Sequence, residues 1–244
     1  TIVAGSGWTT NPDPYFNNPS LPGGVPVEGI VHYKALSFAT TANGTGYKVA
    51  DVLEVNTGTA TTKARAPVAA ITVVGTPVIA DGGINYDSGN GTNGDEVTFT
   101  HAHLTTGLTV RITSDDTGLA TGIAVVTPGI WNGSGTPPTT MANGVNGFTA
   151  TLTHQFTDGN GAGLQLSGIQ WGVYSFGTVS VAGDYTVFPD TSGSLGAVTG
   201  AGMNATAAIT MGLLSVHVTE QGSGYISPAD AALNFDNGAH GASA

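Results

Sequence analysis

A short glycine–aromatic pattern recurs along the chain and constrains the fold more than any other feature of the sequence. Glycine permits the positive φ angle of a tight turn out of a strand, and an aromatic ring can then bury apolar area over that turn. The aromatic residues of successive copies lie 39, 45, 54 and 40 positions apart. The pattern predicts a repeated unit of strand, sealed turn and return strand. Its copies are Asn43–Tyr47, Asp81–Tyr86, Pro128–Trp131, Ala182–Tyr185 and Gln221–Tyr225.

The composition also favours strands over helices. The 244 residues include 38 glycines, and 40% of them are hydrophobic while only 9% are charged. Such a chain is too apolar for general disorder and poor in strong helix formers. We predict an all-β fold of β-sandwich or barrel-like modules, with short strands and glycine-rich turns, preceded by an extended N-terminal arm. Because cysteine is absent, we expect stabilisation through a homo-oligomer, with a trimer preferred by analogy.

The net charge of −11 argues against several partners. Only five residues are basic, too few to neutralise many phosphates, so we expect no nucleic-acid binding. An acidic surface repels anionic membranes, and the longest apolar runs are too short for a spanning helix. No signal peptide is predicted. Thr1 is consistent with removal of an initiator Met or with trimming of a precursor.

The first 35 residues differ from the rest and predict an extended arm. Residues 1–32 hold five of the twelve prolines, which exclude a helix or a central strand. The segment also carries large apolar side chains that a flexible linker would not need. We expect the arm to lie on its own domain or on a neighbouring subunit, the alternative being an irregular segment packed on its own core. The candidate partner-binding residues are Trp8, Tyr15, Phe16, Leu21 and Val31.

Residues 36–244 carry strand and turn signals. Apolar residues alternate with threonines over 97–100, 108–113 and 148–156, which is the period of a half-buried strand. Further strands are expected at 34–39, 50–55, 68–74, 122–127, 164–169, 177–182, 206–211 and 213–219. A division into a first β-rich region (36–118) and a second (119–244) is possible, or the two form one domain. The one helical candidate is Ser227–Phe235, where Pro228 follows a Ser cap.

Metal binding has two weak candidates. His101 and His103, placed on one strand, would present two imidazoles on the same face, with His154 or Asp95 as further ligands. Segments Asp87–Glu96 and Asp158–Gly161 have the oxygen-rich, glycine-rich character of calcium loops but lack the spacing of an EF-hand. Ordinary tight turns use the same residues. We therefore predict no bound metal and no cofactor, with Asp87, Asp95, His101 and His103 as the residues to watch.

Catalysis is not predicted either. The acidic pairs Asp51/Glu54 and Asp115/Asp116 are the most visible, yet nothing selects one of them as the two carboxylates of a glycosidase. No Gly-x-Ser-x-Gly motif stands in the strand–turn–helix context of a nucleophile elbow, and no Gly-x-Gly motif opens a helix as a phosphate loop does. Tryptophans at 8, 131 and 171 could stack on sugars, although they suit sealed turns or interfaces better. No catalytic residue is assigned, and we expect a protein that is not an enzyme.

Two copies of the glycine–aromatic pattern resemble a known class of repeat. Segment Gly44–Leu53 looks like the G-x-G-Y-x-V-G-D-x-L unit of glycine-rich β repeats in tailed-bacteriophage virion proteins, with Ala50 in place of a glycine. Segment Gln221–Pro228 resembles the related G-G-S-G-Y-x-x-P unit, but the residues after Pro228 depart from it. The similarity covers about residues 38–55 and 176–235 and leaves the arm outside.

The resemblance implies a structural role in a virion assembled in the host cytoplasm. We expect a capsid decoration or cement protein that binds the major capsid protein or other virion proteins. The alternatives are a tail, neck or fibre component of the phage, or an adhesin module that binds glycans.

Overall fold

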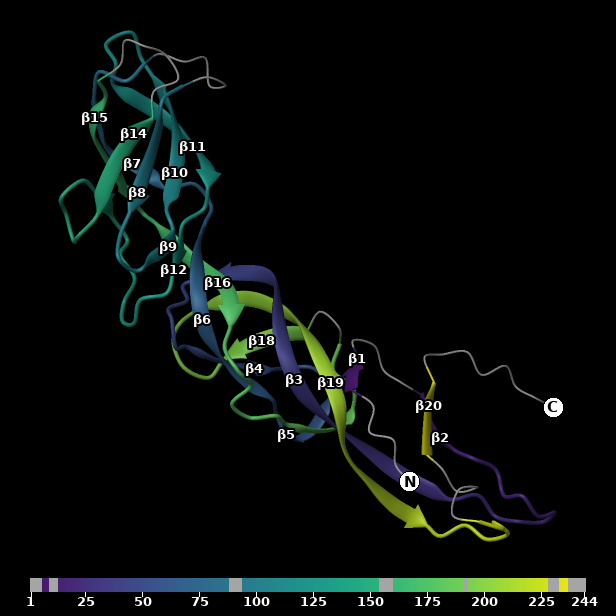
Figure 1. The fold of residues 1–244 in the computed structure, drawn as a ribbon. Coiled ribbons are helices and arrows are strands. Elements are labelled where there is room, and N and C mark those ends of the chain that lie inside the picture. The colour runs from purple at the N-terminus through teal and green to yellow at the C-terminus, as the bar shows by residue number, and fades with distance from the viewer. Residues whose placement is uncertain are drawn as a thin grey trace.

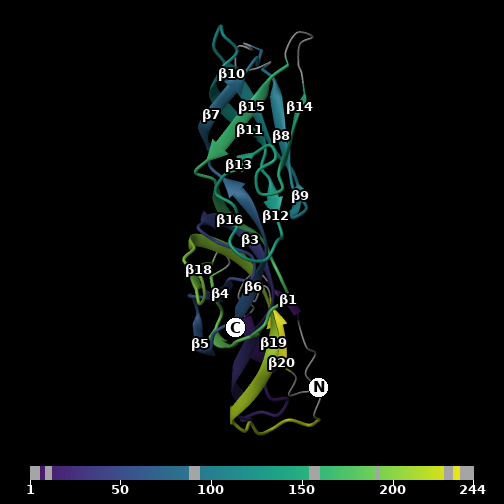
Figure 2. The ribbon, with the colours of Figure 1, turned by 90° about the vertical axis from the view of Figure 1, so that its left-hand side faces the viewer.

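All regular structure in this computed structural model is β-strand, which confirms the predicted all-β fold. The structure describes residues 6–8, 13–87, 94–153, 160–190, 193–227 and 233–236. The molecule is long and bent, with an upper body, a middle body and a narrow lower end when viewed as in Figure 1. A quarter turn shows the same three parts in one row (Figure 2). No helix of the described chain is long and apolar enough to cross a bilayer.

The strands of the middle body and the lower end come from both ends of the chain. They are β1 (Ser6–Trp8), β2 (Asp13–Phe16), β3 (Glu28–Thr45), β4 (Val52–Val55), β5 (Thr59–Thr62), β6 (Arg65–Val74), β16 (Gln170–Phe176), β17 (Asp184–Val187), β18 (Gly193–Ala197), β19 (Met203–Glu220) and β20 (Leu233–Asp236). The upper body holds the strands between them. These are β7 (Val78–Ile84), β8 (Glu96–Thr100), β9 (Leu104–Thr106), β10 (Leu108–Ser114), β11 (Ala120–Thr127), β12 (Ile130–Trp131), β13 (Met141–Ala142), β14 (Thr149–Thr153) and β15 (Ala162–Ser167).

A two-stranded ribbon of β3 and β19 forms the spine of the middle body and the lower end (Figure 1). The two strands pair antiparallel from Thr45↔Met203 to Glu28↔Glu220, with several register shifts. Small and β-branched residues along both strands suit a pleated surface. The two short strands predicted at 206–211 and 213–219 are therefore one strand, because bulges bend the chain without ending the pairing.

The middle body closes around this ribbon. Its sheet has the order β5-β17-β3-β19-β18-β4-β6-β12-β9, and β16 pairs with β6. Leu53, Val55, Ala66, Ile209 and Met211 are almost fully buried in its core. The strand predicted at 177–182 is not formed, since only Val181 makes an isolated bridge there.

The upper body is an insertion between β6 and β16. It contains two sheets of its own, β11-β10-β8-β14 and β13-β15-β7, while its short strands β9 and β12 extend the sheet of the middle body beside β6. Phe99, Leu108, Ile112 and Leu166 point into its core, with 1% or less of each residue exposed. The alternation predicted at 97–100 and 108–113 is confirmed by β8 and β10. The alternation over 148–156 is confirmed for 149–153, and its end lies outside the described residues.

The parts of the molecule do not follow the predicted chain segments. The predicted boundary at 118/119 falls in the turn that joins β10 to β11, two neighbours in one sheet. The predicted arm (1–35) includes the first eight residues of β3, which belong to the central ribbon. The helical candidate Ser227–Phe235 is wrong at its end, because Leu233–Asp236 is a strand paired with β2.

The upper and middle bodies share one strand plan. In the middle body β19 pairs with β3, β18 with β4, β4 with β6, and β6 with β16. In the upper body β15 pairs with β7, β14 with β8, β8 with β10, and β10 with β11, all antiparallel. The sequence of connections is also the same. The molecule therefore contains two copies of one module. The second copy, the upper body, is inserted between β6 and β16 of the first copy. The corresponding strands of the second copy, β10 and β11, are joined by a short turn.

Candidate interaction surface at the lower end

Each module contains a tyrosine that closes over the turn at the end of its first strand. In the middle body, Tyr47 is 1% exposed and its hydroxyl accepts a hydrogen bond from the backbone N–H of Ala205, at 3.3 Å. Gly46, before the tyrosine, has a φ of 80°, a conformation that favours glycine. A Cβ atom on Gly202 would overlap the tyrosine ring. We call this arrangement a tyrosine lock.

The upper body repeats the tyrosine lock. The hydroxyl of Tyr86 accepts from the backbone N–H of Leu164 at 3.1 Å, and a Cβ on Gly161 would overlap the ring. The residue before the tyrosine, Asn85, again has a positive φ, at 60°. In both locks the donor N–H lies three residues after the glycine that contacts the ring.

A third tyrosine lock closes the lower end. The hydroxyl of Tyr225 accepts from the N–H of Val27 at 3.0 Å and donates to the carbonyl of Asn17 at 3.0 Å. Gly224 precedes the tyrosine with a φ of 80°. Three of the five predicted copies thus adopt one conformation.

The two remaining copies are looser. Tyr185 follows its glycine, Gly183, by two residues, and its hydroxyl accepts from Ala64 N–H at 2.8 Å. Trp131 instead donates from Nε1 to the carbonyl of Gly133 at 3.0 Å. Burial raises the pKa of the Tyr185 hydroxyl, and it does the same for the pKa values of Tyr47 and Tyr86. These phenols are therefore held neutral to higher pH than a solvated tyrosine.

A buried carboxylate accompanies the locks of the two complete modules. Asp51 is 1% exposed and accepts from the N–H of Lys48, the residue after Tyr47, at 3.0 Å. Asp95 is fully buried and accepts from the N–H of Asp87, the residue after Tyr86, at 3.0 Å. Both carboxylates thus hold the turn that follows the tyrosine, which is a structural use of these groups.

The central ribbon has an internal two-fold repeat that relates the middle body to the lower end. Gly24 and Gly202 lie 178 positions apart, as do Tyr47 and Tyr225, without any gap between. Burial follows the same shift, because Val31 and Ile209 are both buried. The lock at Tyr225 is therefore the counterpart, across a pseudo-two-fold axis, of the lock at Tyr47.

Strands β2 and β20 extend this correspondence. Leu233 follows Tyr225 by eight residues, as Val55 follows Tyr47, and both side chains are buried. Leu233 pairs with Phe16 of β2, as Val55 pairs with Leu195 of β18. The lower end thus repeats the part of the module formed by β3, β19, β4 and β18.

Among the described residues, the lower end has no strand that corresponds to β6. In the middle body, β6 covers the outer edge of β4, where Val55 N–H donates to the carbonyl of Ala64 at 3.1 Å. Strand β20 pairs only with β2 in the described chain. Likewise Tyr47 N–H donates to the carbonyl of Trp171, whereas the N–H of Tyr225 has no described acceptor. As far as the chain is described, the lower end is therefore an incomplete module.

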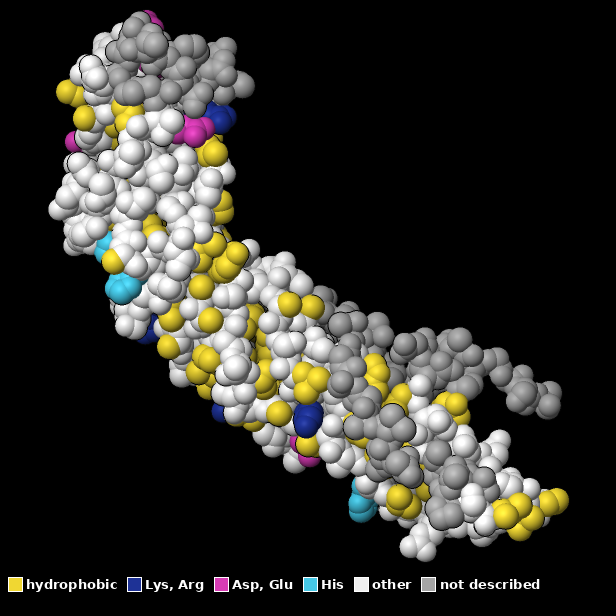
Figure 3. Space-filling view, viewed as in Figure 1, with side chains coloured by type: hydrophobic (Ala, Val, Ile, Leu, Met, Phe, Trp, Pro, Cys, Tyr) yellow, Lys and Arg dark blue, Asp and Glu magenta, His cyan; other side chains and the backbone are white. Residues whose placement is uncertain are grey.

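Large apolar side chains are exposed beside this incomplete module. Ile226 is 71% exposed, Val25 55% and Leu21 49%. Figure 3 shows hydrophobic side chains gathered at the tip of the lower end. At the corresponding places the middle body has Lys48 in place of Ile226 and Thr199 in place of Leu21, while Val25 corresponds to Met203, which is itself 64% exposed. An apolar tip of this kind is typical of a surface that contacts another molecule.

The predicted partner-binding residues divide between the core and this end. Val31 is 6% exposed and belongs to the core. Trp8 packs on Tyr33 and on Phe235, with ring centroids 6.1 and 4.8 Å apart. Tyr15 and Phe16 lie on β2 of the incomplete module. Leu21, at the tip, is the most exposed of the five predicted residues.

The histidine candidates do not lie together on a strand as predicted. His101 and His103 form the turn between β8 and β9, where His101 stacks on Trp131 at 4.9 Å. Within the described ranges no group of three His, Asp, Glu or Cys side chains could hold a metal ion. His154, most of the first candidate calcium loop and half of the second lie outside the described residues.

The acidic pairs have structural partners. Glu54 forms ion pairs with Arg65 (2.6 Å) and Lys63 (3.4 Å), while its neighbour Asp51 is turned into the tyrosine lock. The carboxylate of Asp115 caps its own turn by accepting from the N–H groups of Thr117 and Leu119. The hydroxyl of Thr117 also donates to this carboxylate, and that hydrogen bond, together with those from the N–H groups, lowers the pKa of Asp115.

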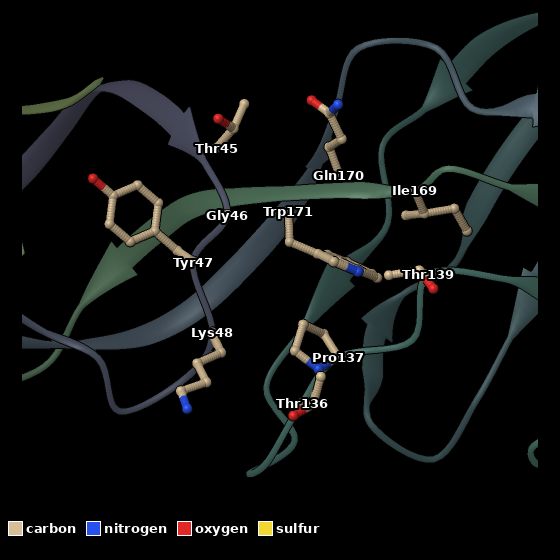
Figure 4. Close-up of a pocket in the computed structure, with 10 residues that line it drawn as sticks. All are labelled: Thr45, Gly46, Tyr47, Lys48, Thr136, Pro137, Thr139, Ile169, Gln170 and Trp171. Atoms are coloured by element: carbon tan, nitrogen blue, oxygen red, sulfur yellow. The ribbon is translucent and has the colours of Figure 1, made fainter. Parts of the chain in front are cut away.

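A pocket of about 390 Å³ lies where the upper and middle bodies meet (Figure 4). Trp171 forms part of its wall but is only 3% exposed, and its indole donates to the carbonyl of Pro138 at 2.7 Å. Little ring surface is therefore left for stacking on a sugar. No carboxylate lines the pocket, so it lacks the acid–base pair of a hydrolase. Its lining residues are Thr45, Gly46, Tyr47, Lys48, Thr136, Pro137, Thr139, Ile169, Gln170 and Trp171.

Sequence reasoning missed the incomplete module, although the signal was present. The 178-residue shift is visible as Gly24, Gly44 and Tyr47 matching Gly202, Gly222 and Tyr225, but Gly24 lies in the segment interpreted as an arm. Comparison with known proteins adds no relative, since no family model, curated protein or solved structure matches this chain.

Proposed function

We propose that this protein is a non-enzymatic structural component of a tailed-phage virion, and that it decorates the capsid by attaching through its lower end. The observation that carries the proposal is the incomplete, apolar module at one end of a long molecule. Two complete modules project from that end (Figures 1 and 2). An elongated body with one unfinished end suits attachment by that end.

The use of the polar groups supports a structural role. Asp51, Asp95 and Asp115 hold turns, and Glu54 and Glu96 pair with arginines on neighbouring strands. The described pockets lack a pair of carboxylates facing one cavity. The glycine-rich virion repeats that Gly44–Leu53 resembles are the basis for naming a phage particle.

A tail, neck or fibre component is the second candidate. The row of modules supports it, because modules joined end to end make extended structures. Both candidates share attachment through the lower end and differ in the surface that receives it. The partner is then the major capsid protein in the first case and a tail protein in the second. A homotrimer, preferred by analogy, stays part of the proposal.

The proposal is tested on phage particles whose genome encodes the chain. Mass spectrometry of purified particles should detect the protein, and gold-labelled antibody should mark the capsid surface. Labelling of the tail alone would favour the second candidate. Absence of the chain from intact particles would reject a virion role.

A matched pair of variants tests the attachment end. Ile226→Glu places a charge on the lower tip, and Ile84→Glu does the same at a similarly exposed position (62%) of the upper body. Particles that lack the protein should take up the wild type and Ile84→Glu but not Ile226→Glu. Equal uptake of both variants would reject attachment through the lower end.

A further inference from the structure

We propose that Asn146 is a site of spontaneous deamidation, selected among the described Asn–Gly pairs by the turn in which it lies. Deamidation at Asn–Gly begins when the backbone nitrogen of the glycine bonds to the carbon of the asparagine side-chain amide. Glycine allows this approach because it has no Cβ. The inference concerns the chemistry of the chain itself and goes beyond the proposed function.

Asn146 and Gly147 are the two central residues of a tight turn between β13 and β14. The N–H of Phe148 donates to the carbonyl of Val145 at 3.0 Å, and the φ angles of Asn146 and Gly147 are 52° and 79°. Positive φ at both central positions is the pattern of a type I′ turn, for which Asn–Gly is a preferred pair. Both residues are exposed, so water reaches them.

The two reacting groups of this pair have no hydrogen bond to hold them. In the part of the chain that the structure describes, neither the side-chain amide of Asn146 nor the N–H of Gly147 has a hydrogen-bond partner. The glycine nitrogen can therefore approach the amide carbon without breaking a bond of the fold.

The pair Asn143–Gly144 lies three residues earlier and is equally open to water, but both of its reacting groups are held. The side-chain Oδ1 of Asn143 accepts from the N–H of Ala150 at 3.2 Å. The N–H of Gly144 donates to the carbonyl of Phe148 at 2.9 Å. Attack by the Gly144 nitrogen would have to break both bonds, which makes this pair a control within the same loop.

The other Asn–Gly pairs that the structure describes are held as well. The side-chain amide of Asn43 donates to the carbonyl of Val173 at 2.7 Å, on the paired strand β3. Gly133 is buried, and a Cβ on it would overlap neighbouring rings. Gly161 lies beneath the ring of Tyr86. The pairs that begin at positions 90, 93 and 237 include residues outside the described ranges.

The reaction consumes only water. The nitrogen of Gly147 bonds to the amide carbon of Asn146, the bond from that carbon to Nδ2 breaks, and ammonia leaves with the proton that the glycine nitrogen gives up. Water then opens the succinimide ring at either carbonyl and yields aspartate or isoaspartate.

Isoaspartate would change the turn that holds a buried ring. It lengthens the backbone by a carbon atom two residues before Phe148, which is 2% exposed. The ring of Phe148 packs on His101 and Trp131, with centroids 4.9 and 6.5 Å apart. Deamidation at Asn146 should therefore loosen this aromatic packing and lower the stability of the upper body.

The test incubates the full chain at mildly alkaline pH, both folded and in denaturant. Digestion with an acid protease and tandem mass spectrometry then follow residues 140–152, where the mass changes as an amide NH2 becomes an OH. In the folded chain Asn146 should react at least about tenfold faster than Asn143, because Asn143 must first open its two hydrogen bonds. In denaturant the two rates should converge, since neither pair is then held.

Two variants test the structural consequence. Asn146→Gly keeps a residue that suits the type I′ turn and removes the reactive amide. Asn143→Asp keeps the oxygen that accepts from Ala150. Incubation of the folded proteins should lower the unfolding temperature of the wild type and of Asn143→Asp, and should lower that of Asn146→Gly much less.

Three results would overturn the proposal. The first is equal rates at Asn143 and Asn146 in the folded chain. The second is a rate at Asn146 that is far slower in the folded chain than in denaturant, which would mean that the turn protects this residue. The third is an equal loss of stability in Asn146→Gly and the wild type. None of them depends on finding the chain in a virion, so this inference and the proposed function can fail separately.

Discussion

The hydroxyl of Tyr47 accepts a hydrogen bond from the backbone N–H of Ala205, 158 positions further along the chain. This contact ties the end of β3 to the start of β19, and Tyr86 and Tyr225 make the same kind of contact in the other two parts of the molecule. The lower end, the middle body and the upper body thus each contain a tyrosine lock of the same kind.

Removal of one hydroxyl should destabilise the fold. Tyr47→Phe leaves the buried N–H of Ala205 without its acceptor, and such a loss costs about 1–3 kcal/mol. Tyr86→Phe should behave alike because Leu164 loses its acceptor. The control is Tyr174→Phe, since Tyr174 is 50% exposed and should change the free energy of unfolding little. Denaturant unfolding measures all three variants, and an unaffected Tyr47→Phe would contradict the role of the lock.

The glycines beneath the rings should not tolerate a methyl group. A Cβ on Gly202 would overlap the ring of Tyr47, and overpacking of this kind costs about 1–3 kcal/mol. Gly161→Ala should be similarly costly because it meets Tyr86. Gly122→Ala is the matched control, because its Cβ would make only an ordinary contact of 3.4 Å with Thr113. Thermal unfolding measures both variants. An unfolding temperature of Gly202→Ala equal to that of Gly122→Ala would contradict the close packing of the Tyr47 ring on Gly202.

Ala50 should be improved by glycine. It is exposed and has a φ of 72°, a left-handed conformation that costs a residue with a Cβ about 1–2 kcal/mol. Ala50→Gly should therefore stabilise the protein. Ala124→Gly, on exposed strand β11, should have the opposite sign, because glycine adds unfolded-state entropy there without relieving strain. If both substitutions destabilise, Ala50 is not strained.

Stability should fall at alkaline pH. Burial raises the pKa values of Tyr47, Tyr86 and Tyr185 in the folded state, while the unfolded tyrosines titrate near about 10. Their contribution is therefore complete below that pH and is lost as the pH rises through the raised folded values. Unfolding measured from neutral to strongly alkaline pH should show this decline, and Tyr47→Phe should show a weaker one. A stability that is flat across this range would contradict the burial of the phenols.

The sequence predicts the strands and the sealed turns, but it does not predict how the modules are nested. Period-two alternation identifies β8 and β10 because each has one buried face and one threonine-rich face. It cannot show that the upper body is inserted between β6 and β16, since pairing of residues about a hundred positions apart leaves no local pattern. The pairing of β2 with β20 is not predictable for a related reason. The two strands are far apart in the sequence, and the prolines near β2 argue against a strand there.

The incomplete lower module is the central claim, and hydrogen exchange in the free chain tests it most directly. Val55 N–H is bonded to Ala64, whereas the counterpart N–H of Leu233 faces an open edge in the described structure. The amide of Leu233 should exchange orders of magnitude faster than that of Val55, at every protein concentration. If the Leu233 amide is as protected as that of Val55 in a monomeric chain, the lower module is already complete and the account is wrong.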